Sequence, residues 1–137
     1  MKNPKKVRVL VDTFHLYQAL TGIKTYTVGL CQGLEVVEKD KVSYFTFPHW
    51  KSAVTSTFLR GKTTPAIKIL NHILFFIWKL IVLPGYIYWN RIDVIISPDF
   101  VAPKIRWRKV VTLPVIHDLF FWEMPQNYNP IWRPYFL

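Results

Sequence analysis

The residues of this chain that are best suited to chemistry stand at the ends of apolar segments in its last third. One such segment ends at Ser97, with Asp99 two positions further on, and another ends at the pair His117 and Asp118. An imidazole beside a carboxylate is suited to general acid–base chemistry. A plainer interpretation stays open, in which Asp118 caps the following turn and His117 is a hydrogen-bonded structural residue.

The two segments that carry these residues, 93–97 and 110–116, are typical of strands buried on both faces of a parallel sheet. The first strand-like segment of the chain, 7–12, also ends in a carboxylate, that of Asp12. In open α/β sheets, ligands bind beyond the carboxyl ends of the strands. We therefore expect the polar residues that end these segments to share one edge of the sheet.

A further candidate site follows the first strand, where Gly22 and Lys24 open a helical pattern with Thr21 as the expected N-cap. The helix is predicted from apolar residues at spacings of three and four, namely Ile23, Tyr26, Leu30, Leu34 and Val37. A glycine lets a ligand approach the amides of a helix N-terminus, which favour a diphosphate, and Lys24 adds positive charge. Alternatively Gly22 only eases a turn, because neither a Gly-x-Gly-x-x-Gly motif nor a P-loop occurs.

The rest of the chain completes an alternating order of elements. Segment 42–47 alternates like a strand, 48–65 is predicted to be a loop, and 67–89 is an apolar helix. This order predicts an α/β fold, a Rossmann-like parallel sheet flanked by helices, in a single domain over residues 1–137.

The apolar segment 67–89 is long enough to cross a membrane, but Lys79 lies near its middle and Pro84-Gly85 interrupts it. A lysine at the centre of a span costs about 2.5–3.5 kcal/mol of insertion free energy. We expect a helix packed in the protein, with a helix that dips into the membrane interface and a true span as the alternatives.

The formal net charge is +10, from 18 basic and 8 acidic residues that are spread evenly, which argues against a separate nucleic-acid-binding arm. The densest basic run is either a solvated loop or a contact with anionic phospholipid, and it consists of Lys104, Arg106, Trp107, Arg108 and Lys109. The single cysteine, Cys31, excludes an internal disulfide and is predicted to be buried. No His/Cys cluster has the spacing of a metal site, so we expect no metal.

Taken together, these segments resemble the N-terminal domain of a family 4-type glycosyltransferase with the GT-B fold. The resemblance covers nearly the whole chain and rests on 9–12, Thr21-Gly22-Ile23, Tyr26, Asp93-Val94, Ser97-Pro98, Phe100, Pro103, 116–119, Pro125 and Tyr128. In that family two Rossmann-like domains face each other, with the acceptor on the N-terminal domain and the nucleotide-sugar on the C-terminal domain. The chain departs from the family at Lys24, where Gly or Ala is common, and at Ile96, where His is common.

The resemblance implies a role for each candidate residue. Gly22 and Lys24 would lie against the donor diphosphate. His117 and Asp118 would be catalytic, with His117 reaching toward the transferred sugar. The acceptor cleft would be lined by Ser97 and Asp99.

We therefore predict the acceptor-side domain of a retaining glycosyltransferase of polysaccharide biosynthesis, which moves a sugar from a nucleotide-sugar to a polysaccharide or glycolipid acceptor. We expect no cofactor besides that donor substrate. The expected partners are the nucleotide-sugar, a glycan or lipid-linked acceptor, an anionic membrane surface and a separately encoded donor domain, but no nucleic acid.

At 137 residues, the chain has room for one domain, and it contains no counterpart of the family's paired-glutamate motif. We expect a C-terminally truncated protein that is inactive alone. The first residues lack a signal-peptide pattern, so a cytoplasmic location is expected, with peripheral attachment to the inner face of the cell membrane. The alternative function is a non-catalytic basic module that binds a membrane surface or nucleic acid, which the interleaving of Trp107 with arginines permits.

Overall fold

The structure is a computed structural model that describes residues 6–19, 22–37, 41–56, 64–105, 109–117, 123 and 126. The elements are β1 (Val7–Asp12), η1 (Phe14–Tyr17), α1 (Gly22–Val36), β2 (Val42–Phe47), α2 (Trp50–Thr55), α3 (Pro65–Ile77), η2 (Trp78–Val82), α4 (Leu83–Trp89), β3 (Val94–Ser97) and β4 (Val111–Pro114). Of these, η1 is a 3₁₀ turn and η2 is a π-helical turn. Helix α2 lies inside 48–65, so the prediction of a loop there was wrong for this part.

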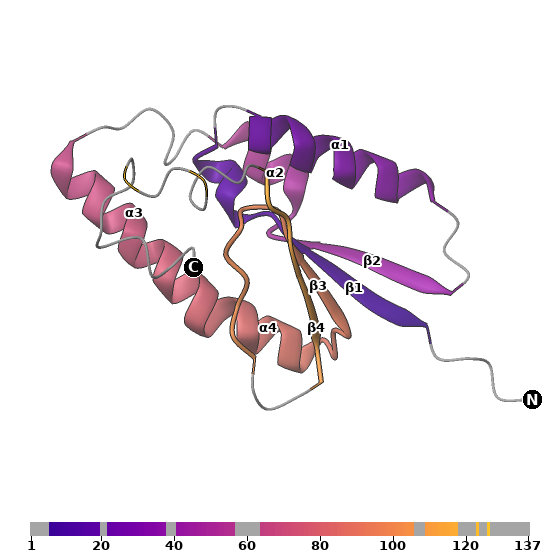
Figure 1. Cartoon of the computed structure of the whole chain (residues 1–137). Coiled ribbons are helices and arrows are strands. Elements are labelled where there is room, and N and C mark those ends of the chain that lie inside the picture. The colour runs from indigo at the N-terminus through magenta and orange to yellow at the C-terminus, as the bar shows by residue number, and fades with distance from the viewer. Residues whose placement is uncertain are drawn as a thin grey trace, which may run out of the picture.

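The four strands form one parallel sheet in the order β2-β1-β3-β4 (Figure 1). Strand β1 is central, and its Val11 is in register with Thr46 of β2 and Ile96 of β3. The α/β architecture with an all-parallel sheet and flanking helices is thereby confirmed. Because all strands run the same way, Asp12, Ser97 and the residues after β4 lie at one edge, the carboxyl edge.

Two apolar clusters cover the two faces of the sheet, because successive side chains of a strand point to opposite faces. Leu10 and Ile95 face η2 and α4, in a cluster completed by Trp78, Leu83, Ile87 and Ile92. Val11 faces the other way, in a cluster completed by Leu16, Cys31, Trp50 and Ala53. The helices α1 and α2 therefore lie on one side and the α4 segment on the other, as Figure 1 shows.

Helix α1 buries part of the predicted apolar stripe, because Leu30 and Leu34 pack against the cluster around Cys31. Thr27 and Cys31 are the buried residues, whereas Tyr26 is 42% exposed and Val37 is 46% exposed. The burial predicted for Cys31 is confirmed. The predicted N-cap, Thr21, lies outside the described residues.

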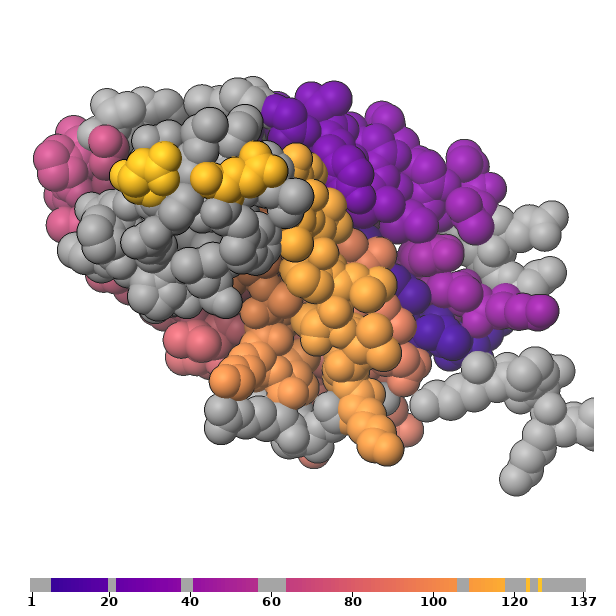
Figure 2. Space-filling view, in the orientation of Figure 1, coloured from indigo at the N-terminus to yellow at the C-terminus, as the bar shows by residue number. Residues whose placement is uncertain are grey.

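Strand β4 is exposed, although the sequence predicts burial on both faces. Val111 is 55% exposed and Leu113 is 47% exposed. The reason is its position, since β4 is the outermost strand of the described sheet and pairs there with β3 alone. Figure 2 shows the segment that contains β4, in light orange, at the surface of the molecule.

Residues from Pro65 to Trp89 form one helix through α3, η2 and α4, long and apolar enough to cross a membrane. Its second part packs against the sheet through buried Trp78, Leu83 and Ile87. Its first part does not, since α3 contains no buried residue, and Figure 1 shows α3 running out past the strands. The prediction of a packed helix is therefore right for η2 and α4 and wrong for α3.

Candidate site at the carboxyl edge of the sheet

A buried lysine connects the ends of β1 and β3 at the carboxyl edge. The Nζ atom of Lys79 lies 2.6 Å from Oδ2 of Asp12 and 2.8 Å from Oδ1 of Asp99. It donates a third bond, 2.6 Å long, to the carbonyl oxygen of Val101. Lys79 is only 3% exposed. All three donors of the ammonium group are thus used, which is the condition under which a buried charge is tolerated.

The carboxylate of Asp12 is fully buried and bonded through both oxygens. Its Oδ1 accepts the indole N–H of Trp78 at 3.0 Å and the backbone N–H of Phe14 at 3.1 Å. Its Oδ2 accepts the ammonium of Lys79. Asp12 therefore ties β1 to both η1 and η2, and the π-helical turn η2 supplies two of its partners. Such turns are frequent at functional sites.

This cluster has one cation for two carboxyl groups. Burial would lower the pKa of Lys79, but the charges of Asp12 and Asp99 outweigh it and raise that pKa, so the ammonium stays charged. Burial raises the pKa of Asp99 to about 6, although Lys79 opposes the shift. Oδ2 of Asp99 is buried and has no hydrogen-bond partner within the described part of the chain. Asp99 is thus the member of the cluster that changes charge near pH 6.

Ser97 ends β3 beside this cluster and is completely buried. Side chains alternate along a strand, so Ser97 shares a face with Ile95, which packs under α4. The hydroxyl oxygen of Ser97 has no hydrogen-bond partner among the described residues. The two residues predicted to line an acceptor cleft, Ser97 and Asp99, therefore both lie at the carboxyl edge, and each has a polar atom that no described residue pairs.

A second histidine, which the sequence analysis missed, belongs to the same edge. Nε2 of His15 lies 2.9 Å from the hydroxyl oxygen of Thr27, and that hydroxyl donates its only proton to the carbonyl of Ile23 at 2.8 Å. Nε2 must therefore be the protonated nitrogen. Burial lowers the pKa of His15 to about 4, against the attraction of Asp12, so the ring is neutral at pH 7.

The other ring nitrogen of His15 is thus an acceptor. Nδ1 of this neutral ring carries a lone pair, and it is buried without a partner in the region that the structure describes. The only signal in the sequence was position, because His15 follows the strand-ending Asp12 by three residues.

His117 lies beyond the end of β4, as the sequence predicts. Its Nε2 donates a 2.7 Å hydrogen bond to the carbonyl oxygen of Pro98. Its ring lies edge-on to Tyr26, with centroids 5.0 Å apart, and edge-on to Phe100 at 5.3 Å. Because Tyr26 is one helical turn from Gly22, the start of α1 and His117 share the carboxyl edge. Any acid–base role of His117 falls to Nδ1, since Nε2 is occupied.

The other predicted site residues fall into three groups. Gly22 is exposed, and a Cβ atom placed on it would meet nothing within 4 Å, so the backbone there faces open space. Lys24 is half-buried, and Lys104 and Lys109 are exposed. Outside the described residues lie Asp118, Arg106, Trp107 and Arg108.

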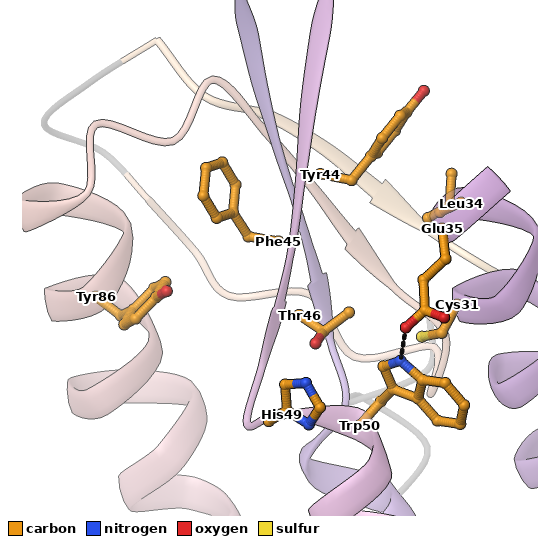
Figure 3. Close-up of a pocket in the computed structure, with 9 residues that line it drawn as sticks. All are labelled: Cys31, Leu34, Glu35, Tyr44, Phe45, Thr46, His49, Trp50 and Tyr86. Atoms are coloured by element: carbon orange, nitrogen blue, oxygen red, sulfur yellow. Dashed lines mark hydrogen bonds between the residues drawn. The ribbon is translucent and has the colours of Figure 1, made fainter. Parts of the chain in front are cut away.

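A separate hollow of about 300 Å³ lies along β2, the other outermost strand of the described sheet. Phe45 and Tyr86 lie on one side of that strand and Glu35 and Trp50 on the other (Figure 3). The hydrogen bond from Trp50 Nε1, 3.1 Å long, and the ammonium of Lys51 lower the pKa of Glu35. Because the charged group of this hollow is already paired, the carboxyl edge is the stronger candidate for chemistry.

Across the described ranges of the chain, no group of three or more His, Cys, Asp or Glu side chains could hold a metal ion. Comparisons with family models, with curated proteins and with solved structures found no match to this chain.

Proposed function

We propose that this chain is the acceptor-side, Rossmann-like half of a retaining glycosyltransferase of the GT-B type. The observation that carries the proposal is the set of buried polar atoms at the carboxyl edge that lack partners among the described residues: Nδ1 of His15, Oγ of Ser97 and Oδ2 of Asp99. Nδ1 of His15 accepts hydrogen bonds, and Oδ2 of Asp99 accepts them while the carboxylate is ionised. Oγ of Ser97 can donate or accept. Because these atoms are buried, a ligand can reach them only when the residues that cover them move aside, and a sugar would then bring the hydroxyl groups that complement them.

The charges of the cluster favour a neutral, hydroxyl-rich ligand over an anion at this position. Lys79 is the nearest cation, and all three of its donors already bind Asp12, Asp99 and Val101. A phosphate beside the two carboxyl groups would be repelled. The diphosphate of a nucleotide-sugar is better suited to the start of α1, where Gly22 is open and Lys24 adds positive charge.

In the proposed reaction an acceptor hydroxyl attacks the anomeric carbon of the donor sugar from the side on which the nucleoside diphosphate leaves. The diphosphate takes the bonding electron pair, and one of its oxygens accepts the proton of the hydroxyl. His15 and Asp99 would orient the acceptor by accepting bonds from its hydroxyl groups. His117 and Asp118 would contact the transferred sugar from the end of β4. The donor-binding half would come from a second domain, so this chain alone is expected not to turn over. The proposed setting is polysaccharide or glycolipid synthesis at the cytoplasmic side of a membrane.

The test is a titration of the nitrogen-15-labelled chain followed by NMR. Neutral oligosaccharides should shift the resonances of His15, Ser97 and Asp99, whereas inorganic pyrophosphate should shift those of Gly22 and Lys24. Ser97→Ala should weaken saccharide binding. The matched control Ser52→Ala, at an exposed position on α2, should not.

The proposal fails if saccharides leave the carboxyl edge unchanged, or if both ligands shift the hollow along β2 instead. A rebuilt enzyme gives the second test. When a donor domain is supplied, His117→Ala should reduce turnover strongly while the fold is kept, and unchanged turnover would make His117 a structural residue.

A further inference from the structure

We propose that one face of the long helix docks this protein on the surface of an anionic phospholipid bilayer, with the helix axis in the membrane plane. We call it the outward face, and it consists of Ile69 (61% exposed), Leu70 (49%), Ile73 (50%), Ile77 (43%), Leu80 (67%) and Ile81 (67%). The proposal rests on exposure and charge and does not depend on the proposed enzyme activity.

The outward face is continuous along α3 and η2. Ile69, Ile73 and Ile77 follow one another at intervals of four, which places them on one side of a helix. Leu80 extends the row into η2, while the buried Trp78 points to the protein. Large contiguous apolar surface of this kind marks an interaction site on a soluble protein.

The lysine in the middle of this helix does not interrupt the outward face. In the sequence, Lys79 argues against lipid contact because a charge near the bilayer centre is unfavourable. In the structure its ammonium is buried between the carboxylates of Asp12 and Asp99, so the charge points to the sheet. The outward face is therefore uncharged, and the exposed Lys68 lies at its flank, where it can reach lipid phosphates.

The same burial favours docking in the plane over spanning. To cross a bilayer, the helix would have to withdraw Lys79, Leu83 and Ile87 from the protein. Two buried carboxyl groups would then lose their cation, which is strongly unfavourable. Lipid can therefore reach this helix from one side only, as in interfacial amphipathic helices.

Two further observations identify the occupant as an anionic bilayer. The helix ends in the exposed aromatic residues Tyr88 (59%) and Trp89 (80%), which are typical of the headgroup level. Because α4 ends where β3 begins, Trp89 lies at the same edge of the sheet as the exposed Lys109, which precedes β4. The net charge of +10 adds attraction to a negative surface.

The test is flotation of the whole chain with two kinds of vesicle, one of phosphatidylcholine alone and one that also contains phosphatidylglycerol. We expect binding to the anionic vesicles, which salt weakens and alkaline carbonate reverses. Ile73→Gln and Leu80→Gln should each weaken vesicle binding about tenfold. In the wild type, docking transfers the exposed half or more of each apolar side chain from water into lipid, and glutamine loses this gain. The matched control is Val36→Gln, since Val36 is an 84% exposed apolar residue on α1 and its variant should bind like the wild type.

Circular dichroism of the variants verifies that their fold is unchanged, which is expected at exposed positions. Four results would overturn the proposal. The first two are absence of binding and equal binding to both kinds of vesicle. The third is retention on the vesicles after carbonate extraction, which indicates a span. The fourth is a dimer in light scattering that Ile73→Gln dissociates, which indicates that a second copy covers the outward face.

Discussion

Replacing Lys79 with methionine tests whether the buried cluster joins the long helix to the carboxyl edge. Methionine keeps most of the apolar stem and removes the ammonium. Asp12 and Asp99 then lose the shared donor at 2.6 and 2.8 Å. Removal of one partner from a buried ion pair costs about 3–5 kcal/mol. We expect the free energy of unfolding to fall by roughly that amount near pH 8.

The loss should depend on pH in a defined direction. Burial already raises the pKa of Asp99 to about 6, and removing Lys79 removes the attraction that opposes this shift. A protonated Asp99 needs no counter-ion, so the substitution should be less destabilising near pH 5 than near pH 8. In the wild type, the raised pKa of Asp99 means that its contribution to stability falls as pH rises toward about 6. The contribution of Lys79, whose pKa is raised above its ordinary value, is present below that value and is lost only at higher, alkaline pH.

The assay is urea unfolding followed by tryptophan fluorescence at both pH values. The matched control is the neutral triple variant Lys79→Met/Asp12→Asn/Asp99→Asn. The amide that replaces the carboxylate of Asp12 keeps an oxygen for the N–H groups of Trp78 and Phe14, so most of the stability should return. The reasoning is refuted by a loss below about 1 kcal/mol, by equal losses at the two pH values, or by a triple variant no more stable than Lys79→Met.

Three further predictions concern single groups. Burial and the charge of Glu35 raise the pKa of Cys31 to about 11, so iodoacetamide should modify the unfolded chain but not the folded one near pH 8. His15, with its pKa lowered by burial to about 4, should show a neutral, Nε2-protonated ring in nitrogen-15 spectra near pH 6, and its contribution to stability should be lost as pH falls from about 6.5 toward 4. Gly29→Ala should raise the free energy of unfolding by about 0.5–1 kcal/mol, because the added methyl group meets nothing within 4 Å in α1 and urea unfolding will measure the gain.

The strands β1, β3 and β4 were predictable because each belongs to a short, mainly apolar run, and β2 was predictable because its residues alternate. The parallel arrangement follows from the alternation of strands with helices. The missed helix, α2, has only six residues, and its N-cap His49 makes no capping side-chain bond. Such a helix leaves too little sequence for a periodic pattern. The buried centre of α1 was not predicted because it includes a polar residue, Thr27, whose hydroxyl bonds to Ile23 and His15. Hydrophobicity alone cannot identify a buried hydroxyl that has its partners.

Some residues of the candidate site were likewise predictable from the sequence and others were not. Ser97, Asp99 and His117 were predictable because each ends or follows a strand, and parallel strands bring their ends together. Lys79 was not, since no local pattern relates it to Asp12, which lies 67 residues earlier in the chain. In the sequence it is a charge within an apolar segment, and only the tertiary structure shows that two carboxylates neutralise it.

The position of Lys79 also connects the two proposals. Lys79 faces the carboxyl edge, whereas the next residue, Leu80, is 67% exposed on the outward face. Successive residues of a helix point about 100° apart, so the two faces are adjacent sides of one helix. If the outward face lies on a bilayer, Asp99, which binds Lys79 at 2.8 Å, lies beside the helix that contacts the lipid. A sugar linked to a lipid reaches that position directly from the membrane, whereas a free oligosaccharide gains nothing from docking. When the titrations are repeated in the presence of vesicles, a short-chain glycolipid should therefore bind more tightly than the free oligosaccharide. Leu80→Gln should weaken the binding of the glycolipid and leave that of the free oligosaccharide unchanged.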